Sequence, residues 1–79
     1  MRINKDIVTF KSNNVMFKKE LSGNKNNTVR RLNSEETKEF YEAELKTVCI
    51  VNSETGESFK RIISDITEWW DIIIISWRD

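Results

Sequence analysis

The chain has 79 residues, of which 13 are basic and 13 acidic, with no histidine, no proline and one cysteine. A chain of this length has room for one hydrophobic core, so we expect a single domain over residues 1–79 and exclude a large multidomain enzyme. The missing histidine excludes serine–histidine and cysteine–histidine catalysis and removes the usual ligands of zinc, haem and non-haem iron. We therefore expect neither a metal nor a cofactor.

Two features of the sequence favour a cytoplasmic protein without a membrane partner. The first residues contain no apolar segment, and the longest apolar run, Ile72 to Ile75, is far shorter than a membrane span. A lone cysteine cannot form an intramolecular disulfide, so Cys49, which lies between Val48 and Ile50, is expected to be a buried thiol in a reducing compartment.

The zero net charge hides an asymmetry along the chain. Residues 1–31 carry eight basic and two acidic side chains, a net charge of +6, and residues 32–79 carry five basic and eleven acidic ones, a net charge of −6. On charge alone, mutual neutralisation across one folded surface is the simpler interpretation, and a basic face for nucleic acid beside an acidic face is the alternative. Either way, the pattern predicts a polarised surface.

The first half of the chain predicts a strand, a helix and a second strand. Asp6 to Phe10 is β-branched and aromatic, as in a strand. Residues 12–14 can cap a two-turn helix whose apolar stripe we expect at Val15, Met16, Phe17 and Leu21. Gly23 then ends the helix, because glycine accepts the left-handed conformation found at helix ends. After a polar loop, residues 28–32 alternate as a half-buried strand does.

The second half predicts a β-rich region. Residues 33–44 read as a short helix or an irregular acidic segment, in which Asn33 and Glu36 have the spacing of a capping box. Strands are expected at residues 45–52 and 58–65, joined by a turn that contains Gly56. Residues 71–77 contain four consecutive isoleucines, which favours a central or barrel-closing strand with both faces covered. The order predicts an α+β fold: a small β-barrel, open or closed, with one or two short helices.

The most informative segment lies between the first helix and the second strand. Gly23 permits a tight turn, Lys25 brings a positive charge, Thr28 brings a hydroxyl, and Arg30 brings a planar fork that can bind phosphate. In a strand, Thr28 and Arg30 would share one face, with Arg31 on the other. By spacing alone, a solvated basic turn and an anion site both remain open.

The pattern Gly-x-Lys-x-x-Thr-x-Arg, after a helix that carries Phe17 and Leu21, resembles the signature of ASCH domains, a branch of the PUA-like β-barrel superfamily. The end of the chain, residues 62–66 and 71–77, is similar to the last strands of such domains. The resemblance implies a PUA-like barrel with a cleft that holds RNA, a nucleotide or a modified nucleoside. The implied binding residues are Gly23, Lys25, Thr28, Arg30 and Arg31, with Lys18 and Lys19 strengthening the positive field. The chain also resembles small phage or prophage proteins, which implies the host cytoplasm as its compartment.

Some ASCH-like proteins remove acyl groups from acetylcytidine, and the resemblance implies a second possible function from them. Thr28 would be the nucleophile and Lys25 its activating base or charge, with Glu57 as the candidate carboxylate. Glu57 adjoins Gly56 in the expected turn, which disfavours this function. A third alternative is a phage-encoded protein that binds a host protein through its acidic residues 33–57 or an exposed edge strand.

The three tryptophans can serve either the core or a ligand. Trp69 and Trp70 could stack on nucleic-acid bases, but tryptophans near strand ends are more often part of the core. We expect Trp77 to be buried.

Overall fold

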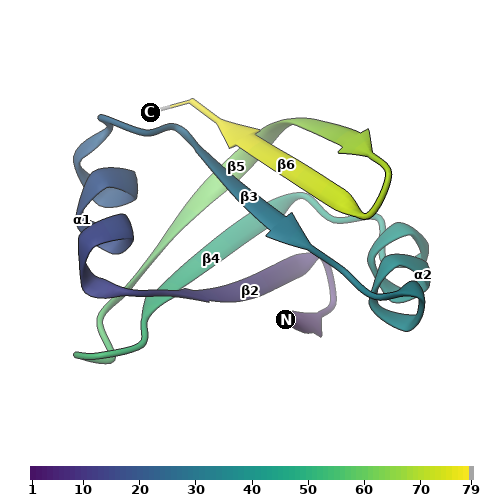
Figure 1. The fold of residues 1–79 in the computed structure, drawn as a ribbon, viewed down its shortest axis with the longest axis horizontal. Helices are drawn as coiled ribbons and strands as arrows, with labels where there is room; N and C mark the ends of the chain where they lie inside the picture. The colour runs from purple at the N-terminus through teal and green to yellow at the C-terminus, as the bar shows by residue number, and fades with distance from the viewer. Residues whose placement is uncertain (79) are drawn as a thin grey trace.

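A computed structural model describes residues 1–78 and shows an α+β fold with six strands and two short helices (Figure 1). Along the chain the elements are β1 (Arg2–Asn4), β2 (Ile7–Ser12), α1 (Asn14–Ser22), β3 (Asn27–Arg31), α2 (Ser34–Glu42), β4 (Thr47–Asn52), β5 (Ser58–Trp69) and β6 (Ile72–Trp77). The expected α+β class and both helices are confirmed, and the predicted strands occur in the expected order with β1 in addition.

The strands form one mixed sheet in the order β1-β2-β4-β5-β6-β3. β2 and β4 are parallel, and all other neighbours are antiparallel. β5 pairs with β4 through its first half and with β6 through its second half, and a register shift between Ile63 and Asp65 separates the two regions. Bulges of this kind bend a strand. The sheet does not close into a barrel, because β1 and β3 remain its two edges.

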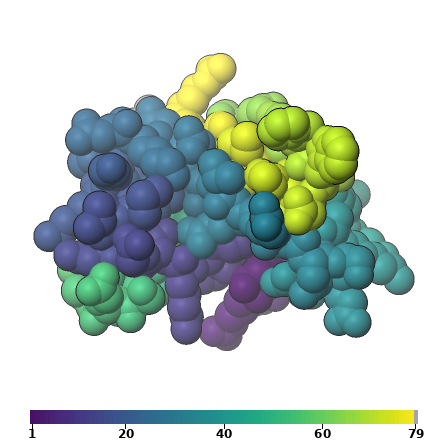
Figure 2. Space-filling model, viewed as in Figure 1, coloured from purple at the N-terminus to yellow at the C-terminus, as the bar shows by residue number. Residues whose placement is uncertain are grey.

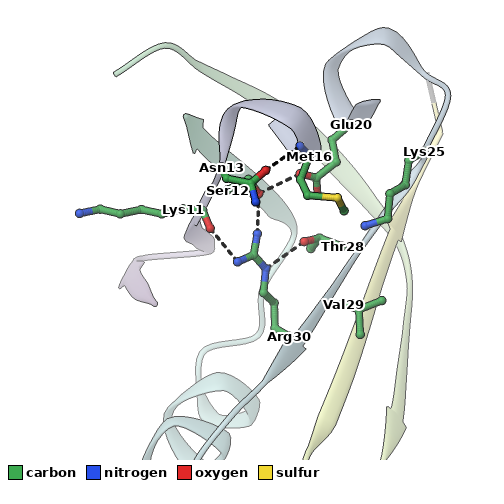
Figure 3. A pocket seen from close by; sticks show the side chains of 9 residues that line it. All are labelled: Lys11, Ser12, Asn13, Met16, Glu20, Lys25, Thr28, Val29 and Arg30. Carbon is green, nitrogen blue, oxygen red and sulfur yellow. Dashed lines mark hydrogen bonds between the residues drawn. The ribbon is translucent and has the colours of Figure 1, made fainter. Parts of the chain in front are cut away.

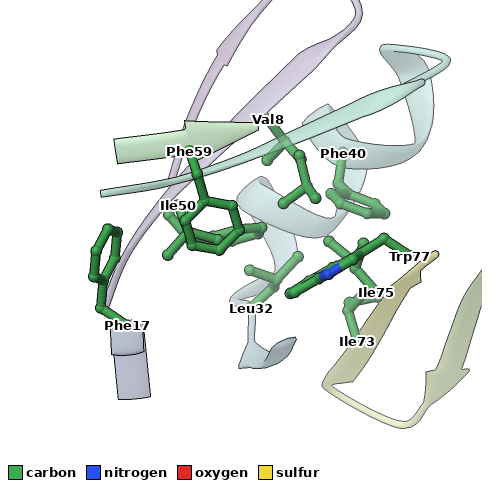
Figure 4. Packing of buried hydrophobic residues seen from close by; sticks show 11 residues of the cluster. Val8, Phe17, Leu32, Phe40, Ile50, Phe59, Ile73, Ile75 and Trp77 are labelled. Carbon is green, nitrogen blue, oxygen red and sulfur yellow. The ribbon is translucent and has the colours of Figure 1, made fainter. Parts of the chain in front are cut away.

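The hydrophobic core fills the space that the bent sheet encloses (Figure 4). Phe59 of β5 connects two other aromatic rings of this core, with its ring centroid 5.4 Å from that of Phe17 and 6.2 Å from that of Trp77. Ile73 and Ile75 of β6 are almost completely buried, and the neighbouring isoleucines of this strand are half-buried. β6 is therefore the central strand that its isoleucine run predicts, and the burial of Trp77 is also confirmed.

The helix caps follow the sequence. The side chain of Asn13 accepts a hydrogen bond from Met16 N at 2.9 Å, and Gly23 ends α1 with φ 85°. Asn33 and Glu36 form the predicted capping box at the start of α2. Neither helix within residues 1–78 is long and apolar enough to cross a bilayer. Cys49 is buried and free, as expected.

The two helices lie at opposite ends of the sheet (Figure 1). The lysine-bearing α1 and the start of β3 occupy one side of the face drawn in Figure 2, and the glutamate-rich α2 lies on the other. The predicted charge separation is thus present between the ends that carry the helices. Glu54 interrupts it, because its carboxylate accepts a hydrogen bond from Asn14 N at the start of α1, 2.6 Å away.

Four expectations about these elements are wrong. The structure contains the strand β1, which the sequence did not predict, and β5 continues to Trp69 instead of ending at Asp65. The predicted apolar stripe of α1 fails at Val15 and Leu21, which are exposed. Trp69 and Trp70 are not core residues: they are 66% and 84% exposed at the β5–β6 turn. The register continues to the tip of this hairpin, so the tryptophans have no core to enter.

The β5–β6 turn carries local backbone strain that a substitution can relieve. Trp70 has φ 61°, a conformation that costs an L-residue about 1–2 kcal/mol. Because its side chain is exposed, we expect Trp70→Gly to raise the free energy of unfolding by about 0.5–1 kcal/mol after the entropy cost of glycine. Urea unfolding followed by circular dichroism measures it. Trp69→Gly, at a strand position, should lower stability; an equal loss in both variants would contradict this account.

The single tyrosine gives a second test, because its hydroxyl ties α2 to β5. Tyr41 Oη donates to Glu68 Oε2 at 2.8 Å, and burial together with this carboxylate raises the pKa of Tyr41 to about 12. The ordinary pKa is about 10. The contribution of the Tyr41–Glu68 hydrogen bond to the stability of the fold is therefore complete below pH about 10 and is lost as the pH rises through 12. Ultraviolet absorbance should show tyrosinate forming near pH 12, and earlier in Glu68→Gln; a midpoint near 10 in the native protein would refute the contact.

Candidate functional site

A polar cavity of about 240 Å³ lies where α1 and β2 meet β3 (Figure 3). Its walls come from the end of β2, the start of α1 with Glu20, the segment before β3, and β3 itself. The residues that line it are Lys11, Ser12, Asn13, Met16, Glu20, Lys25, Thr28, Val29 and Arg30. Three of the residues singled out from the sequence, Lys25, Thr28 and Arg30, therefore share one cavity.

Arg30 connects β3 to β2 through its side chain. Its Nη1 donates to the carbonyl oxygen of Lys11 at 2.7 Å, and its Nη2 donates to Ser12 Oγ at 2.7 Å. Its Nε donates to Thr28 Oγ1 at 2.9 Å, and its Cζ lies 4.9 Å from the centroid of the Phe10 ring. Within residues 1–78 no backbone hydrogen bond joins these two strands, so the guanidinium forms the junction that the sheet leaves open.

Glu20 is the acidic residue of the cavity, and it is 1% exposed. Its Oε1 accepts a hydrogen bond from Ser12 Oγ at 2.8 Å, whereas its Oε2 is buried without a partner among the described residues. The other buried polar atom without a partner there, Trp77 Nε1, belongs to the hydrophobic core. Buried carboxylate oxygens normally accept a hydrogen bond. Glu20 Oε2 therefore offers an acceptor to a ligand that carries an N–H or O–H group.

Arg30 also keeps hydrogen-bonding capacity for a ligand. A guanidinium has five N–H groups, and three of them donate to protein atoms here. Burial lowers the pKa of Arg30, and the negative charge of Glu20 partly offsets this shift. Arginine stays protonated under such conditions. The cavity thus contains a fixed cation with unused donors beside a fixed anion with an unused acceptor.

β3 places Thr28 and Lys25 through local geometry. Thr28 and Arg30 point inward and Val29 and Arg31 are exposed, which confirms the predicted alternation. Two residues after the left-handed Gly23, Lys25 N donates to the carbonyl oxygen of Lys19 at 3.1 Å. This connection aims the half-buried Lys25 side chain into the cavity, toward Thr28 (Figure 3).

The remaining predicted residues lie outside the cavity. Arg31 faces solvent and pairs with Asp71 at 3.3 Å, and Lys18 and Lys19 are exposed on α1. Gly23 acts through the backbone, as the C-cap of that helix. Glu57 is exposed at the end of the β4–β5 turn and does not line the cavity. Among the described residues, Glu20 is the acidic residue that lines the cavity together with Lys25 and Thr28.

Sequence reasoning missed Glu20, Ser12 and the Lys11 carbonyl. Glu20 follows two lysines, a context typical of a solvated helix surface. A signal was nevertheless present, because Glu20 lies three residues after Phe17 and so shares its face of the helix. Phe17 and Glu20 are the buried residues of α1.

Comparison with known proteins gives no relative: no family model matches the chain, and no curated protein matches it. The assignment of a function therefore depends on the residues of the cavity and their geometry.

The Arg30 junction can be tested by its effect on stability. Arg30→Lys keeps the charge but loses the planar fork, so we expect the free energy of unfolding to fall by about 1–3 kcal/mol, measured by urea denaturation. The neighbouring variant Arg31→Lys alters only an exposed ion pair and should change stability by less than about 0.5 kcal/mol. Equal effects of the two substitutions would show that the junction is not structural.

Proposed function

We propose that this protein binds RNA, a nucleotide or a related anionic ligand through the segment Gly23-x-Lys25-x-x-Thr28-x-Arg30. The observation that carries this proposal is the convergence of Lys25, Thr28 and Arg30 in one cavity. The unused Arg30 donors and the Lys25 ammonium supply the contacts that ligand oxygens require. The exposed Lys18, Lys19 and Arg31 extend the positive field beyond the cavity.

The size of the cavity limits what can enter it. Its volume of about 240 Å³ is below the usual range of about 300–1,000 Å³ for small-molecule pockets. One base or one compact polar group fits such a space, whereas a folded RNA would place most of its mass outside. We therefore favour a single nucleotide unit as the buried part of the ligand.

The sequence resemblance to ASCH domains agrees with this function. The six-stranded mixed sheet with two helices is compatible with a small α+β domain of this type, although the sheet is open. In our proposal the protein is an ASCH-like module of phage or prophage origin that acts in the host cytoplasm.

Titration with single-stranded and structured RNA at two salt concentrations tests the binding function. We expect binding that weakens as salt rises, because cation–phosphate contacts release counterions. The double variant Lys25→Ala/Arg30→Lys should lose at least tenfold in affinity, about 1.4 kcal/mol. Lys38→Ala, which removes one positive charge from α2, should match the unmodified protein.

Two results would count against the binding function. One is the absence of binding by the folded protein at low salt, and the other is an affinity that neither salt nor the double variant changes. Either result would favour the alternative of a protein that binds a host protein.

Amide hydrolysis is a second candidate, and the position of Glu20 favours it. A threonine hydroxyl, a lysine and a carboxylate line the same cavity. In this reaction Thr28 Oγ1 attacks the acyl carbon while its proton passes to Lys25 in its neutral amine form, and Lys25 returns that proton to the nucleoside amine as the C–N bond breaks. Water then releases the acid from the threonine ester. Glu20, rather than Glu57, would orient Lys25.

Incubation with acetylcytidine and detection of acetate tests the hydrolytic function. We expect Thr28→Ala to abolish acetate release, because this mechanism depends on the Thr28 hydroxyl as its nucleophile. Thr28→Ser, which keeps the hydroxyl, should retain activity. Full activity in Thr28→Ala would exclude the threonine mechanism.

A further inference from the structure

A second cavity, of about 700 Å³, adjoins the first across Arg30. Its lining residues are Met1, Arg2, Thr9, Phe10, Lys11, Arg30 and Val51. Lys11 and Arg30 line both cavities, so the two spaces meet at the junction between β2 and β3. This junction is open because β1 pairs only with residues Ile7 to Thr9 of β2 and leaves the end of that strand uncovered.

The two cavities differ in charge. The first contains the buried carboxylate of Glu20 beside Lys25 and Arg30, and the charged side chains that line the second are Arg2, Lys11 and Arg30, all basic. Figure 3 shows the Lys11 ammonium directed away from the first cavity, to which this residue contributes its backbone carbonyl. The first cavity is therefore lined by charges of both signs, whereas the charged side chains that line the second are all positive among the described residues.

We propose that these cavities form one two-part nucleotide site, in which the first holds the nucleobase and the second holds the phosphate attached to the same nucleoside. This inference rests on the proposed nucleotide-binding function and assigns the two ends of the ligand. The chemistry is shared by a free nucleotide and by a nucleotide within a single strand.

The partner-free oxygen of Glu20 determines the orientation. A phosphate in the first cavity would lie near a buried carboxylate, and like charges repel strongly where water is excluded. Nucleobases instead present N–H donors beside carbonyl or ring-nitrogen acceptors. Glu20 Oε2 can accept from such an N–H, and Lys25 and an unused Arg30 N–H can donate to the neighbouring acceptor.

Arg30 is suited to contact both parts because it cannot move freely. Three hydrogen bonds and the Phe10 ring fix the plane of its guanidinium, and two N–H groups remain unused. A donor held in place by the protein loses little conformational entropy when it binds a ligand. Arg2 and Lys11 then add point charges on the phosphate side.

Calorimetric titration of the whole chain with the four ribonucleosides and their 5′-monophosphates tests this assignment. We expect the monophosphate of the preferred base to bind about tenfold more tightly than its nucleoside, because it adds charge-assisted contacts. Arg2→Ala should remove most of this gain and leave nucleoside affinity unchanged. The control Lys38→Ala should keep the gain, and Glu20→Gln should weaken nucleoside and monophosphate equally.

Three outcomes overturn the two-part site while the binding function survives. The first is that nucleoside and monophosphate bind with equal affinity. The second is that Arg2→Ala and Lys38→Ala change the affinity for the monophosphate equally. The third is that inorganic phosphate competes with the nucleoside for the first cavity. If the folded protein binds neither nucleotides nor RNA at low salt, the binding function fails as well.

A tetranucleotide distinguishes the two sources of the nucleotide. Tighter binding than the monophosphate, with the same loss in Arg2→Ala, assigns the site to a nucleotide within a strand. Equal binding, again reduced in Arg2→Ala, assigns it to a free nucleotide. Both results support the two-part site, whereas tetranucleotide binding that Arg2→Ala leaves unchanged contradicts it.

Discussion

The Arg30 guanidinium joins two strands that share no backbone ladder, and the cavity exists because it does so. A backbone ladder between β3 and the end of β2 that β1 leaves uncovered would leave no space between these strands. Here one planar side chain spans the gap, with its hydrogen bonds divided between a hydroxyl on its own strand and two oxygens of β2. The same side chain supplies positive charge near Glu20, which is connected to it through Ser12 Oγ. Removing either charged partner would leave the other buried without compensation.

This arrangement links the stability of the fold to the chemistry of the site. The bonds that close the junction use three of the five N–H groups of Arg30 and one oxygen of Glu20, and the groups that remain unused line the cavity. A ligand can therefore bind without breaking the contacts that hold β2 and β3 together. A ligand that satisfies Glu20 Oε2 also removes the desolvation penalty of an unpaired buried oxygen, about 1–3 kcal/mol for such a group. Folding and ligand binding would thus use different atoms of the same two side chains, Arg30 and Glu20.

Short sequence patterns correctly predicted the features that depend on a few neighbouring residues. The capping pair Asn33 and Glu36, the left-handed Gly23 and the alternation of Thr28 and Arg30 each follow from spacing within a few residues, and each is present. Glu20 was missed because its hydrogen-bond partner, Ser12, lies on a different element of the chain, where it also accepts from Arg30 of β3. Closure of the barrel could not be predicted either, since it depends on whether the two edge strands meet. Trp69 and Trp70 are exposed because β5 extends past the core, a length that composition does not reveal.

Basic and acidic side chains, which cancel in the net charge of the chain, also lie together in this cavity. A cavity lined only by cations would accept almost any polyanion, since attraction between opposite charges carries little structural information. One buried carboxylate changes what the cavity can accept. An anionic group of the ligand must stay away from Glu20, and a hydrogen-bond donor of the ligand must lie next to it. Such a residue lowers the affinity for anions in general and raises the selectivity for a ligand with both kinds of group. Glu20, one of the two acidic residues among residues 1–31, would therefore set the selectivity of the proposed site.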